Sequence, residues 1–210
     1  MSDANTDAET PQLYLITPAE FDLSAFPDQL AAILDSTEIA CVRLALASHD
    51  EDRINRAADA LREITHARDV ALVINNHFVL AERLGLDGVH LCDGTRNVRK
   101  ARKALGPDAI VGSFCSTSRH DGMSAGEAGA DYIAFGPVTA GALGNAEAAE
   151  DELFSWWSEM IELPVVAEGG LDLAAIARLA PLTDFFGIGD EIWTAEDPQS
   201  ALKTLLAPLS

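Results

Sequence analysis

The feature that most constrains the fold is a ladder of eight short apolar runs, separated by segments long enough to form one helix each. The runs cover residues 13–17, 39–46, 70–76, 88–93, 109–113, 131–137, 164–170 and 184–190. Strands that alternate with helices pair in parallel, because each crossover returns the chain to the same end of the sheet. Eight such units in one domain-sized chain predict an α/β protein built as a single (β/α)8 TIM barrel.

The chain of 210 residues is short for such a barrel but within its range, so we expect one domain over residues 12–210. Residues 1–11 are rich in Asp, Asn, Thr and Ala, and we expect them to form a disordered N-terminal tail. This segment lacks the basic and apolar regions of a signal peptide.

The formal net charge of −20 excludes two classes of partner. Nucleic acids and anionic membranes both require Lys or Arg to neutralise phosphates, so we expect neither to bind. The three cysteines, Cys41, Cys92 and Cys115, are far apart and have no metal-ligand spacing. They are typical of reduced thiols, and the sequence therefore predicts a cytoplasmic protein.

The segments between the runs carry helix signals. Asp50 is a plausible N-cap for the helix that follows it, and Gly85 is placed to end the next one. The apolar face expected for that next helix comprises Phe78, Val79, Ala81 and Leu84. The longest connection, residues 138–150, follows the sixth run and is in the position of an active-site loop.

Five motifs together carry a family resemblance. They are LYLIT at 13–17, VINN at 73–76, DGVHL at 87–91, GADYIAFGPV at 129–138 and PVVAEGGL at 164–171. In this order and spacing the chain resembles the thiamine phosphate synthase/TenI family from about residue 13 to residue 206. The resemblance implies a barrel that joins an aminopyrimidine diphosphate to a thiazole phosphate in thiamine biosynthesis and releases pyrophosphate. It also implies Mg²⁺ and basic side chains that hold the leaving diphosphate.

The resemblance places the diphosphate and metal site on the second to fourth runs. It implies a catalytic role for Asn75 and substrate contacts for Arg43, Asn75 and Asn76. Asn76 stands where the family has a magnesium-binding Asp, and the second family acid is displaced to Asp93, the one metal ligand that we predict. The sequence therefore predicts a degraded Mg²⁺ and diphosphate site.

Further substrate contacts are implied on the later runs. Ser113 offers a hydroxyl at the end of the fifth run, and Thr139 stands in a loop where the family has a threonine-rich segment ending in Lys. No Lys is present in that loop. The backbone N–H groups of Gly169 and Gly170 could still bind an anion. Glu168, Gly189 and Asp190 are the remaining implied substrate contacts.

The ends of the runs also predict an acidic mouth. Asp93, Glu168, Asp190 and Glu191 all follow or end an apolar run, and few basic groups face them. Such a rim would suit a cation or an amine-bearing heterocycle better than a diphosphate. The alternative is that these acids point outward on a generally acidic surface.

Two histidines have different interpretations. His90 lies inside a strand pattern, so we expect a packed, hydrogen-bonded barrel histidine. His120 is expected in the loop after the fifth run, near where thiazole-tautomerising relatives place a working histidine, and it is a general-base candidate.

Two function hypotheses follow. The first is a thiamine phosphate synthase, a transferase whose activity is in doubt because diphosphate-binding residues are missing. The alternative is a diverged TenI-like barrel without synthase activity, either a thiazole tautomerase or a heterocycle-binding protein. A metal-dependent hydrolase that uses the acidic rim is a poorer third option. In each case the partner is a small heterocycle, phosphorylated in the first hypothesis, and the segment with Trp156 and Trp157 could support a homodimer.

Overall fold

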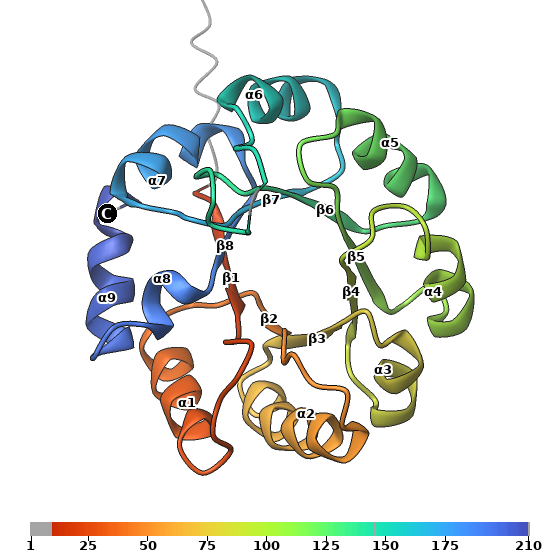
Figure 1. Cartoon of the computed structure of the whole chain (residues 1–210), viewed down its shortest axis with the longest axis vertical. Coiled ribbons are helices and arrows are strands. Elements are labelled where there is room, and N and C mark those ends of the chain that lie inside the picture. Colours follow the sequence, from red (N-terminus) through yellow and green to blue (C-terminus); the bar gives the residue numbers. More distant parts are fainter. Residues whose placement is uncertain (1–9, 145, 210) are drawn as a thin grey trace, which may run out of the picture.

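Eight parallel strands close into one barrel in the computed structural model, which describes residues 10–144 and 146–209. Each strand pairs with its neighbours in sequence, and β1 pairs with β8 to close the ring (Figure 1). The strands are β1 Gln12–Ile16, β2 Cys41–Leu44, β3 Ala71–Asn75, β4 Gly88–Leu91, β5 Ile110–Phe114, β6 Tyr132–Phe135, β7 Val165–Glu168 and β8 Phe185–Ile188. The predicted TIM barrel is confirmed, and each strand lies within or beside its apolar run.

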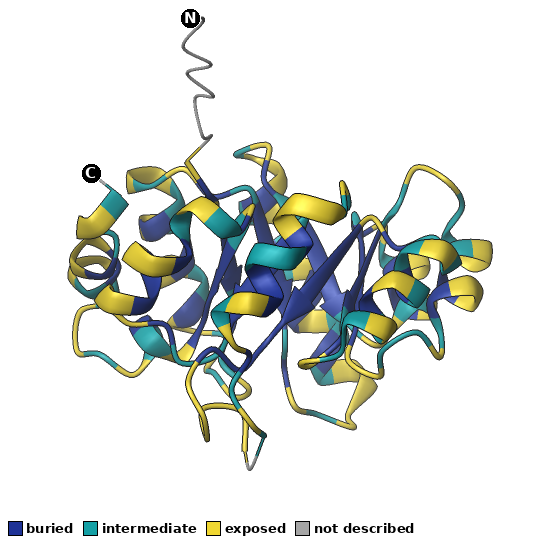
Figure 2. Ribbon diagram, turned by 90° about the horizontal axis from the view of Figure 1, so that it is seen from above, coloured by how far each residue is buried: buried dark blue, intermediate teal, exposed yellow. Residues whose placement is uncertain are grey.

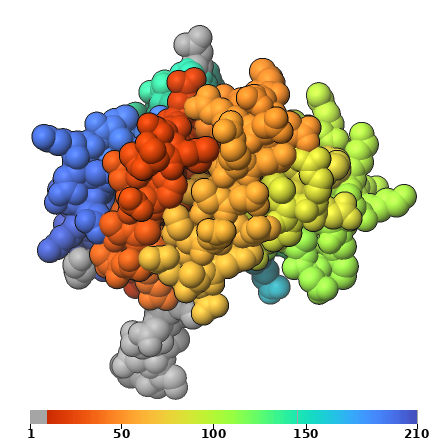
Figure 3. All heavy atoms as spheres, turned by 90° about the horizontal axis from the view of Figure 1, so that it is seen from below, coloured from red at the N-terminus to blue at the C-terminus, as the bar shows by residue number. Residues whose placement is uncertain are grey.

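A ring of helices covers the outside of the barrel (Figure 1). The helices are α1 Phe26–Ser36, α2 Glu51–His66, α3 Phe78–Leu84, α4 Val98–Leu105, α5 Arg119–Ala128, α6 Asp151–Met160, α7 Leu173–Leu179, α8 Asp190–Trp193 and α9 Pro198–Leu205. Two 3₁₀ turns follow α7 and α9, at Ala180–Leu182 and Ala207–Leu209. Figure 3 shows the side where α1 and α2 meet, with α9 in blue on one flank and α3 and α4 in yellow-green on the other.

The apolar residues form two layers of core. The larger layer lies between the strands and the helices, and the smaller layer fills the barrel interior. Figure 2 shows the buried strands inside helices whose outward faces are exposed. Because side chains alternate along a strand, each strand supplies residues to both layers, which explains why the runs are apolar on both faces.

Glycines allow large side chains to cross the interior. A Cβ on Gly112 would lie 2.0 Å from Cζ of Tyr132, so the tyrosine ring occupies the space that a side chain at residue 112 would need. Tyr14 and Tyr132 meet edge to face across the barrel with their ring centroids 5.7 Å apart. These two rings contact the buried polar groups described below.

The helix signals in the sequence are largely confirmed. The Asp50 carboxylate caps α2 by accepting hydrogen bonds from the backbone N–H groups of Asp52 and Arg53, and Gly85 ends α3 in the left-handed conformation. The expected face of α3 is wrong at Val79, which is 62% exposed, whereas Leu80 is buried. The buried face of this short helix is formed by Leu80 and Ala81, so it differs by one residue from the expected face.

The predicted tail at residues 1–11 falls mostly outside the described residues. Thr10 is exposed and Pro11 is buried, so the chain already packs against the barrel at the residue before β1. None of the helices in the described part of the chain is long and apolar enough to cross a membrane.

Candidate active site at the mouth of the barrel

A cavity of about 370 Å³ opens at the carboxyl ends of β1, β2, β7 and β8. Parallel α/β barrels carry their chemistry at this end of the strands. The lining residues are Ile16, Thr17, Ala19, Arg43, Ala45, Ala142, Leu143, Glu168, Gly169, Gly170, Gly187, Gly189, Asp190 and Glu191. Six of the predicted substrate-binding residues therefore meet here, namely Arg43, Glu168, Gly169, Gly170, Gly189 and Asp190.

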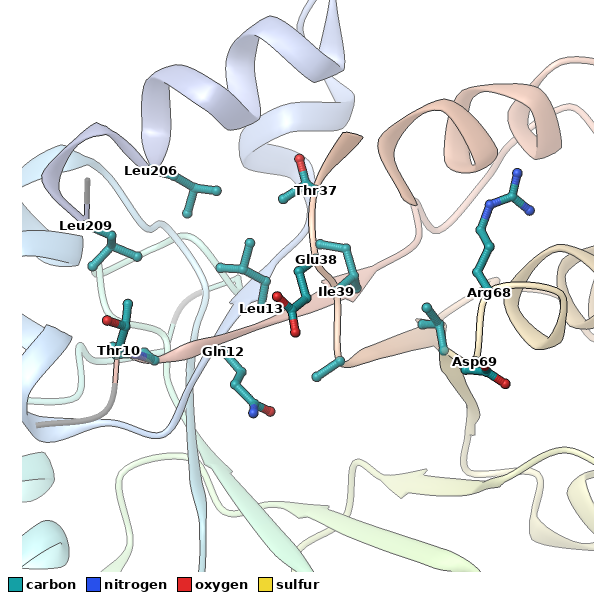
Figure 4. Close-up of a pocket in the computed structure, with 13 residues that line it drawn as sticks. Thr10, Gln12, Leu13, Thr37, Glu38, Ile39, Arg68, Asp69, Leu206 and Leu209 are labelled. Carbon is teal, nitrogen blue, oxygen red and sulfur yellow. The ribbon is translucent and has the colours of Figure 1, made fainter. Parts of the chain in front are cut away.

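A larger cavity of about 770 Å³ lies at the opposite end of the barrel (Figure 4). Its walls are the residues that enter the strands, among them Gln12 and Ile39, together with Leu206 and Leu209 at the end of the chain. The amino-terminal face of such barrels serves stability rather than chemistry. We therefore place the candidate site at the smaller cavity.

The floor of the mouth is a buried ion pair between Arg43 of β2 and Glu168 of β7. Nη1 of Arg43 donates to Oε2 of Glu168 at 2.9 Å, and Nη2 donates to Oε1 at 3.2 Å. Both side chains are less than a tenth exposed. Two parallel hydrogen bonds orient both groups and neutralise their charges locally.

The same guanidinium begins a chain of hydrogen bonds across the barrel. Nη1 of Arg43 lies 2.7 Å from Nε2 of His90, and Nδ1 of His90 lies 2.9 Å from the hydroxyl of Tyr132. Because a guanidinium can only donate, Nε2 accepts and Nδ1 carries the imidazole proton. Tyr132 accepts from His90, and its hydroxyl also forms a hydrogen bond of 2.7 Å with the Tyr14 hydroxyl. The prediction that His90 is a packed, hydrogen-bonded residue is confirmed.

Burial sets the protonation of this network. Burial is the largest single influence on Arg43 and lowers its pKa, but the Glu168 carboxylate and the two tyrosine hydroxyls together hold that pKa above its ordinary value. Burial and then the Arg43 charge lower the pKa of His90 well below its usual range. Burial raises the pKa of both Tyr14 and Tyr132. The interior therefore contains one charged pair, a neutral imidazole and two neutral phenols.

A cradle of backbone N–H groups forms one wall of the mouth. Oε1 of Glu191 accepts from the N–H groups of Gly170 at 2.8 Å and Leu171 at 3.1 Å. Oε2 of Glu191 accepts from the N–H of Gly189 at 2.7 Å. Donors from the turns after β7 and β8 thus converge on one carboxylate, as expected for an anion site built from main chain.

The loop after β6 packs onto the turn after β7. Gly169 and Gly170 have φ values of +85° and +77°, which favour glycine. A Cβ on Gly170 would lie 2.7 Å from Cβ of Thr139, and the Thr139 hydroxyl donates to the carbonyl of Gly170 at 2.6 Å. Thr139 therefore holds this loop in place, and Leu143 of the same loop lines the cavity.

Asparagines at the end of β3 have two different environments. Asn76 has a left-handed backbone (φ +59°), and its amide oxygen accepts from the N–H of Cys92 at 2.8 Å. Oδ1 of Asn75 is buried and has no hydrogen-bond partner among the described residues. Asn76 thus joins β3 to the turn after β4, whereas Asn75 keeps a buried acceptor for another group.

Among the described residues, those at the family's metal positions do not form a cluster of carboxylates that could hold Mg²⁺. The oxygen of Asn76 is used by Cys92, and Asp93, which is exposed, accepts from Nδ2 of Asn97 at 2.6 Å. Glu168 is committed to Arg43. Within residues 10–144 and 146–209 no group of three or more His, Cys, Asp or Glu side chains is placed to hold a metal.

Ser113 and His120 lie away from the cavity lining, as do Asn75, Asn76 and Thr139. Ser113 is fully buried in β5 and donates to the carbonyl of Gly94 at 2.8 Å, which anchors the turn after β4. His120 was expected in a loop, but it is the second residue of α5 and is exposed. The helix begins earlier than expected because Ser118 caps it through the N–H of Asp121. The role of His120 as a general base remains a prediction.

The expectation of an unbalanced acidic mouth is corrected by these contacts. Glu168 is paired with Arg43 and Glu191 is held by three N–H donors, so of the four predicted acids Asp190 alone lines the cavity and is exposed. Sequence reasoning missed Tyr14, Tyr132 and the role of Glu191. A usable signal was present for the tyrosines, since polar side chains at inward positions of apolar strands stand out.

The fold and the site define a (β/α)8 barrel that presents a backbone anion cradle and a polar floor at the carboxyl end of its strands. Residues 13–184 match the family model described as thiamine monophosphate synthase (TMP-TENI). The chain is 44% identical to the thiamine-phosphate synthase of Rhodospirillum centenum, over 87% of this chain and 89% of the relative. It is 37% identical to that of Erythrobacter litoralis, over 92% and 93% of the two chains. The chain belongs to the thiamine monophosphate synthase/TenI family.

Solved structures agree at the level of the fold. Thiamine phosphate pyrophosphorylase from Pyrococcus furiosus superimposes with a TM-score of 0.81 at 22% identity, covering 94% of this chain and 95% of the other. A 3-hexulose-6-phosphate synthase superimposes with a TM-score of 0.70 at 16% identity, covering 95% of this chain and 100% of the other. The same barrel therefore occurs in proteins named for different reactions.

Proposed function

We propose that this chain acts in thiamine biosynthesis as a thiamine phosphate synthase-type barrel with a weakened hold on diphosphate. It would join an aminopyrimidine diphosphate to a thiazole phosphate at the barrel mouth. The whole-length relation to thiamine-phosphate synthases supports this role, at 44% identity to the Rhodospirillum centenum protein. The structural observation that carries the proposal is the cradle of three backbone donors beside the cavity.

The proposed reaction needs no proton transfer. The bond between the pyrimidine methylene carbon and the diphosphate oxygen breaks, and the diphosphate leaves with the electron pair. The lone pair of the thiazole nitrogen then forms the new carbon–nitrogen bond. The protein must therefore hold the two rings in line and stabilise the charge that develops on the leaving group.

The described residues offer suitable contacts for the two rings. The buried oxygen of Asn75 would accept a hydrogen bond from the amino group of the pyrimidine. The N–H groups of Gly170 and Gly189 would bind the phosphate of the thiazole. The small side chains of Ala45 and Ala142, which line the cavity with Gly170 and Gly189, would leave room for flat rings.

The weakened hold on diphosphate follows from the charges. Arg43 is the one cation among the described lining residues, and Glu168 already neutralises it. A leaving diphosphate would therefore meet less positive charge than the family's basic clamp provides. Breaking of the carbon–oxygen bond to the diphosphate would be slower as a result.

The test is formation of thiamine phosphate from the two authentic substrates in a buffer with magnesium. We expect product above a no-protein background. The Asn75→Ala variant should lower the rate at least tenfold, while Gln29→Ala, which removes an exposed amide on α1, should leave it within twofold. Absence of product from folded protein at high substrate would reject the synthase proposal.

A second candidate is a heterocycle-binding barrel or thiazole tautomerase without pyrophosphate chemistry. The commitment of Arg43 to Glu168 favours it, because no described cation at the mouth remains unpaired for a diphosphate. Calorimetry with pyrophosphate and magnesium separates the two candidates. Tight, magnesium-dependent binding supports the synthase, whereas binding of the thiazole without binding of pyrophosphate supports the second candidate.

We also propose a cytoplasmic location and a homodimer as working expectations. The three free cysteines would stay reduced in the cytoplasm. Phe154 and Trp157 of α6 are buried in the core, while Met160 at the end of α6 is 64% exposed and would support a contact between copies. Sedimentation of the purified chain checks the second expectation.

A further inference from the structure

The carboxylate of Glu191 occupies the anion cradle of the protein's own mouth. Glu191 is the second residue of α8, and its side chain folds back onto the N–H of Gly189. Its other oxygen reaches the N–H groups of Gly170 and Leu171 on the neighbouring turn. One side chain thus uses three main-chain donors contributed by two strand ends.

These donors belong to the cavity where a ligand would lie. Gly170, Gly189 and Glu191 all line it, and Glu191 is only partly buried. A phosphoryl group that entered the mouth would need the same N–H groups, because Arg43 is held by Glu168. Two anions cannot share three donors without strong repulsion, so ligand and side chain exclude each other.

We propose that Glu191 is a resident anion that a ligand's phosphoryl group must displace. Glu191 is then the residue that determines how well this mouth discriminates between phosphorylated and unphosphorylated ligands. The apparent affinity for a phosphorylated ligand is reduced by the fraction of molecules in which the cradle is open. This inference rests on the proposed function for the identity of the ligand but not for the competition itself.

A purely structural role makes a different prediction. If Glu191 serves only to satisfy three buried N–H groups, its removal lowers stability and exposes no useful anion site. If Glu191 competes with ligands, its removal opens the cradle, and added phosphate restores the hydrogen bonds that were lost.

The experiment measures binding of inorganic phosphate by calorimetry to the parent chain and three variants. We expect Glu191→Ala to bind phosphate at least tenfold more tightly than the parent. The affinity of Glu191→Gln for phosphate should rise at least threefold, because the negative charge is lost. Asp190→Ala removes the same charge from the same cavity but frees no N–H group, so its gain should stay below threefold. Phosphate should also raise the Tm of Glu191→Ala by more than that of the parent.

Two results would overturn the inference. One is a folded Glu191→Ala protein whose phosphate affinity lies within twofold of the parent. The other is an equal gain in Asp190→Ala, which would show that charge alone is responsible. If Glu191→Ala does not fold, Glu191→Gln decides the question by the same measurement.

The phosphate titration needs no heterocycle, so its outcome is separate from that of the synthase assay. A gain in phosphate binding without any thiamine phosphate product supports the role of Glu191 and rejects the proposed function. Thiamine phosphate product without a gain in phosphate binding supports the proposed function and rejects the role of Glu191. In an active chain, Glu191→Ala should lower KM for thiazole phosphate with little change in kcat.

Discussion

The guanidinium of Arg43 and the carboxylate of Glu168 are 125 residues apart in sequence and meet in the barrel interior. Removing two charges from water is costly, and these charges tolerate burial because they form two hydrogen bonds with each other. His90 adds a third contact to the guanidinium. The interior of the barrel is thus specified by polar side chains as well as by apolar packing.

Loss of one partner should leave the other charge buried and unpaired. We expect Glu168→Gln to lower the free energy of unfolding by about 3–5 kcal/mol, measured by urea denaturation. The double variant Arg43→Met with Glu168→Leu should recover much of this loss. As a matched control, Glu51→Ala removes an exposed ion pair with Arg83 and should cost at most about 1 kcal/mol. A cost for Glu168→Gln as small as that of the control would contradict the ion-pair account.

The depressed pKa of His90 gives stability a particular dependence on pH. The unfolded chain takes up a proton below about pH 6.5, whereas the folded chain keeps His90 neutral, because burial and the Arg43 charge lower its pKa. The contribution of His90 to stability is therefore complete above this pH and falls as the pH decreases. Its slope approaches about 1.4 kcal/mol per pH unit.

This contribution can be isolated with a neutral substitute. Urea denaturation between pH 8 and pH 5 should show a smaller loss of stability on acidification for His90→Gln than for the parent. The slopes, rather than the absolute free energies, are the readout, since the substitution also alters packing. Parallel curves for the two proteins would contradict the assignment.

At the scale of elements, the loop after β6 and the turn after β7 act together. The loop is built of small residues and contacts the turn at Gly169 and Gly170. Hydrogen bonds from the N–H groups of Val138 and Thr139 to the carbonyl of Gly169 reinforce the contact. The position of the loop over the mouth therefore depends on the absence of side chains on the turn.

A pair of glycine substitutions separates steric conflict from backbone strain. Gly170→Ala adds a Cβ that would lie 2.7 Å from Thr139, at a φ of +77°. Gly94→Ala adds a Cβ at a φ of +65° with nothing within 4 Å, so it reports strain alone. We expect Gly94→Ala to cost about 1–2 kcal/mol and Gly170→Ala to cost at least about 1 kcal/mol more, by chemical denaturation. Equal costs would show that the loop does not press on the turn.

The elements themselves could be predicted well from sequence. Apolar runs and capping residues are local signals, so the eight strands and the caps at Asp50 and Gly85 were predicted correctly. The errors, Val79 on α3 and His120 in a loop, occur where a short helix rotates or begins early by less than one turn. Tertiary packing decides such details.

At the scale of the whole molecule, the barrel fold and the cavity at the carboxyl ends of its strands could be predicted from the sequence. The contacts that neutralise the acidic side chains in this cavity could not. Glu168 and Glu191 were correctly expected at the mouth as acids. Their neutralisation by Arg43 and by three N–H groups depends on strand register and on turn geometry. Charge counted along a sequence therefore overestimates the negative field of a folded site.

Under the proposed function, the ligand of this barrel binds at the carboxyl-end mouth rather than in the larger cavity at the other end. Ala45 lines the mouth and Glu38 lines the larger cavity, so each position can be blocked by a tryptophan. The decisive measurement is a ligand-observed NMR titration of thiazole phosphate into the parent, Ala45→Trp and Glu38→Trp chains.

We expect Ala45→Trp to weaken binding at least tenfold, because the indole would occupy the space between Arg43 and the cradle, and Glu38→Trp to bind like the parent. Unfolding by urea verifies that both variants are folded. Retained binding in Ala45→Trp together with lost binding in Glu38→Trp would contradict the account and move the site to the opposite face of the barrel.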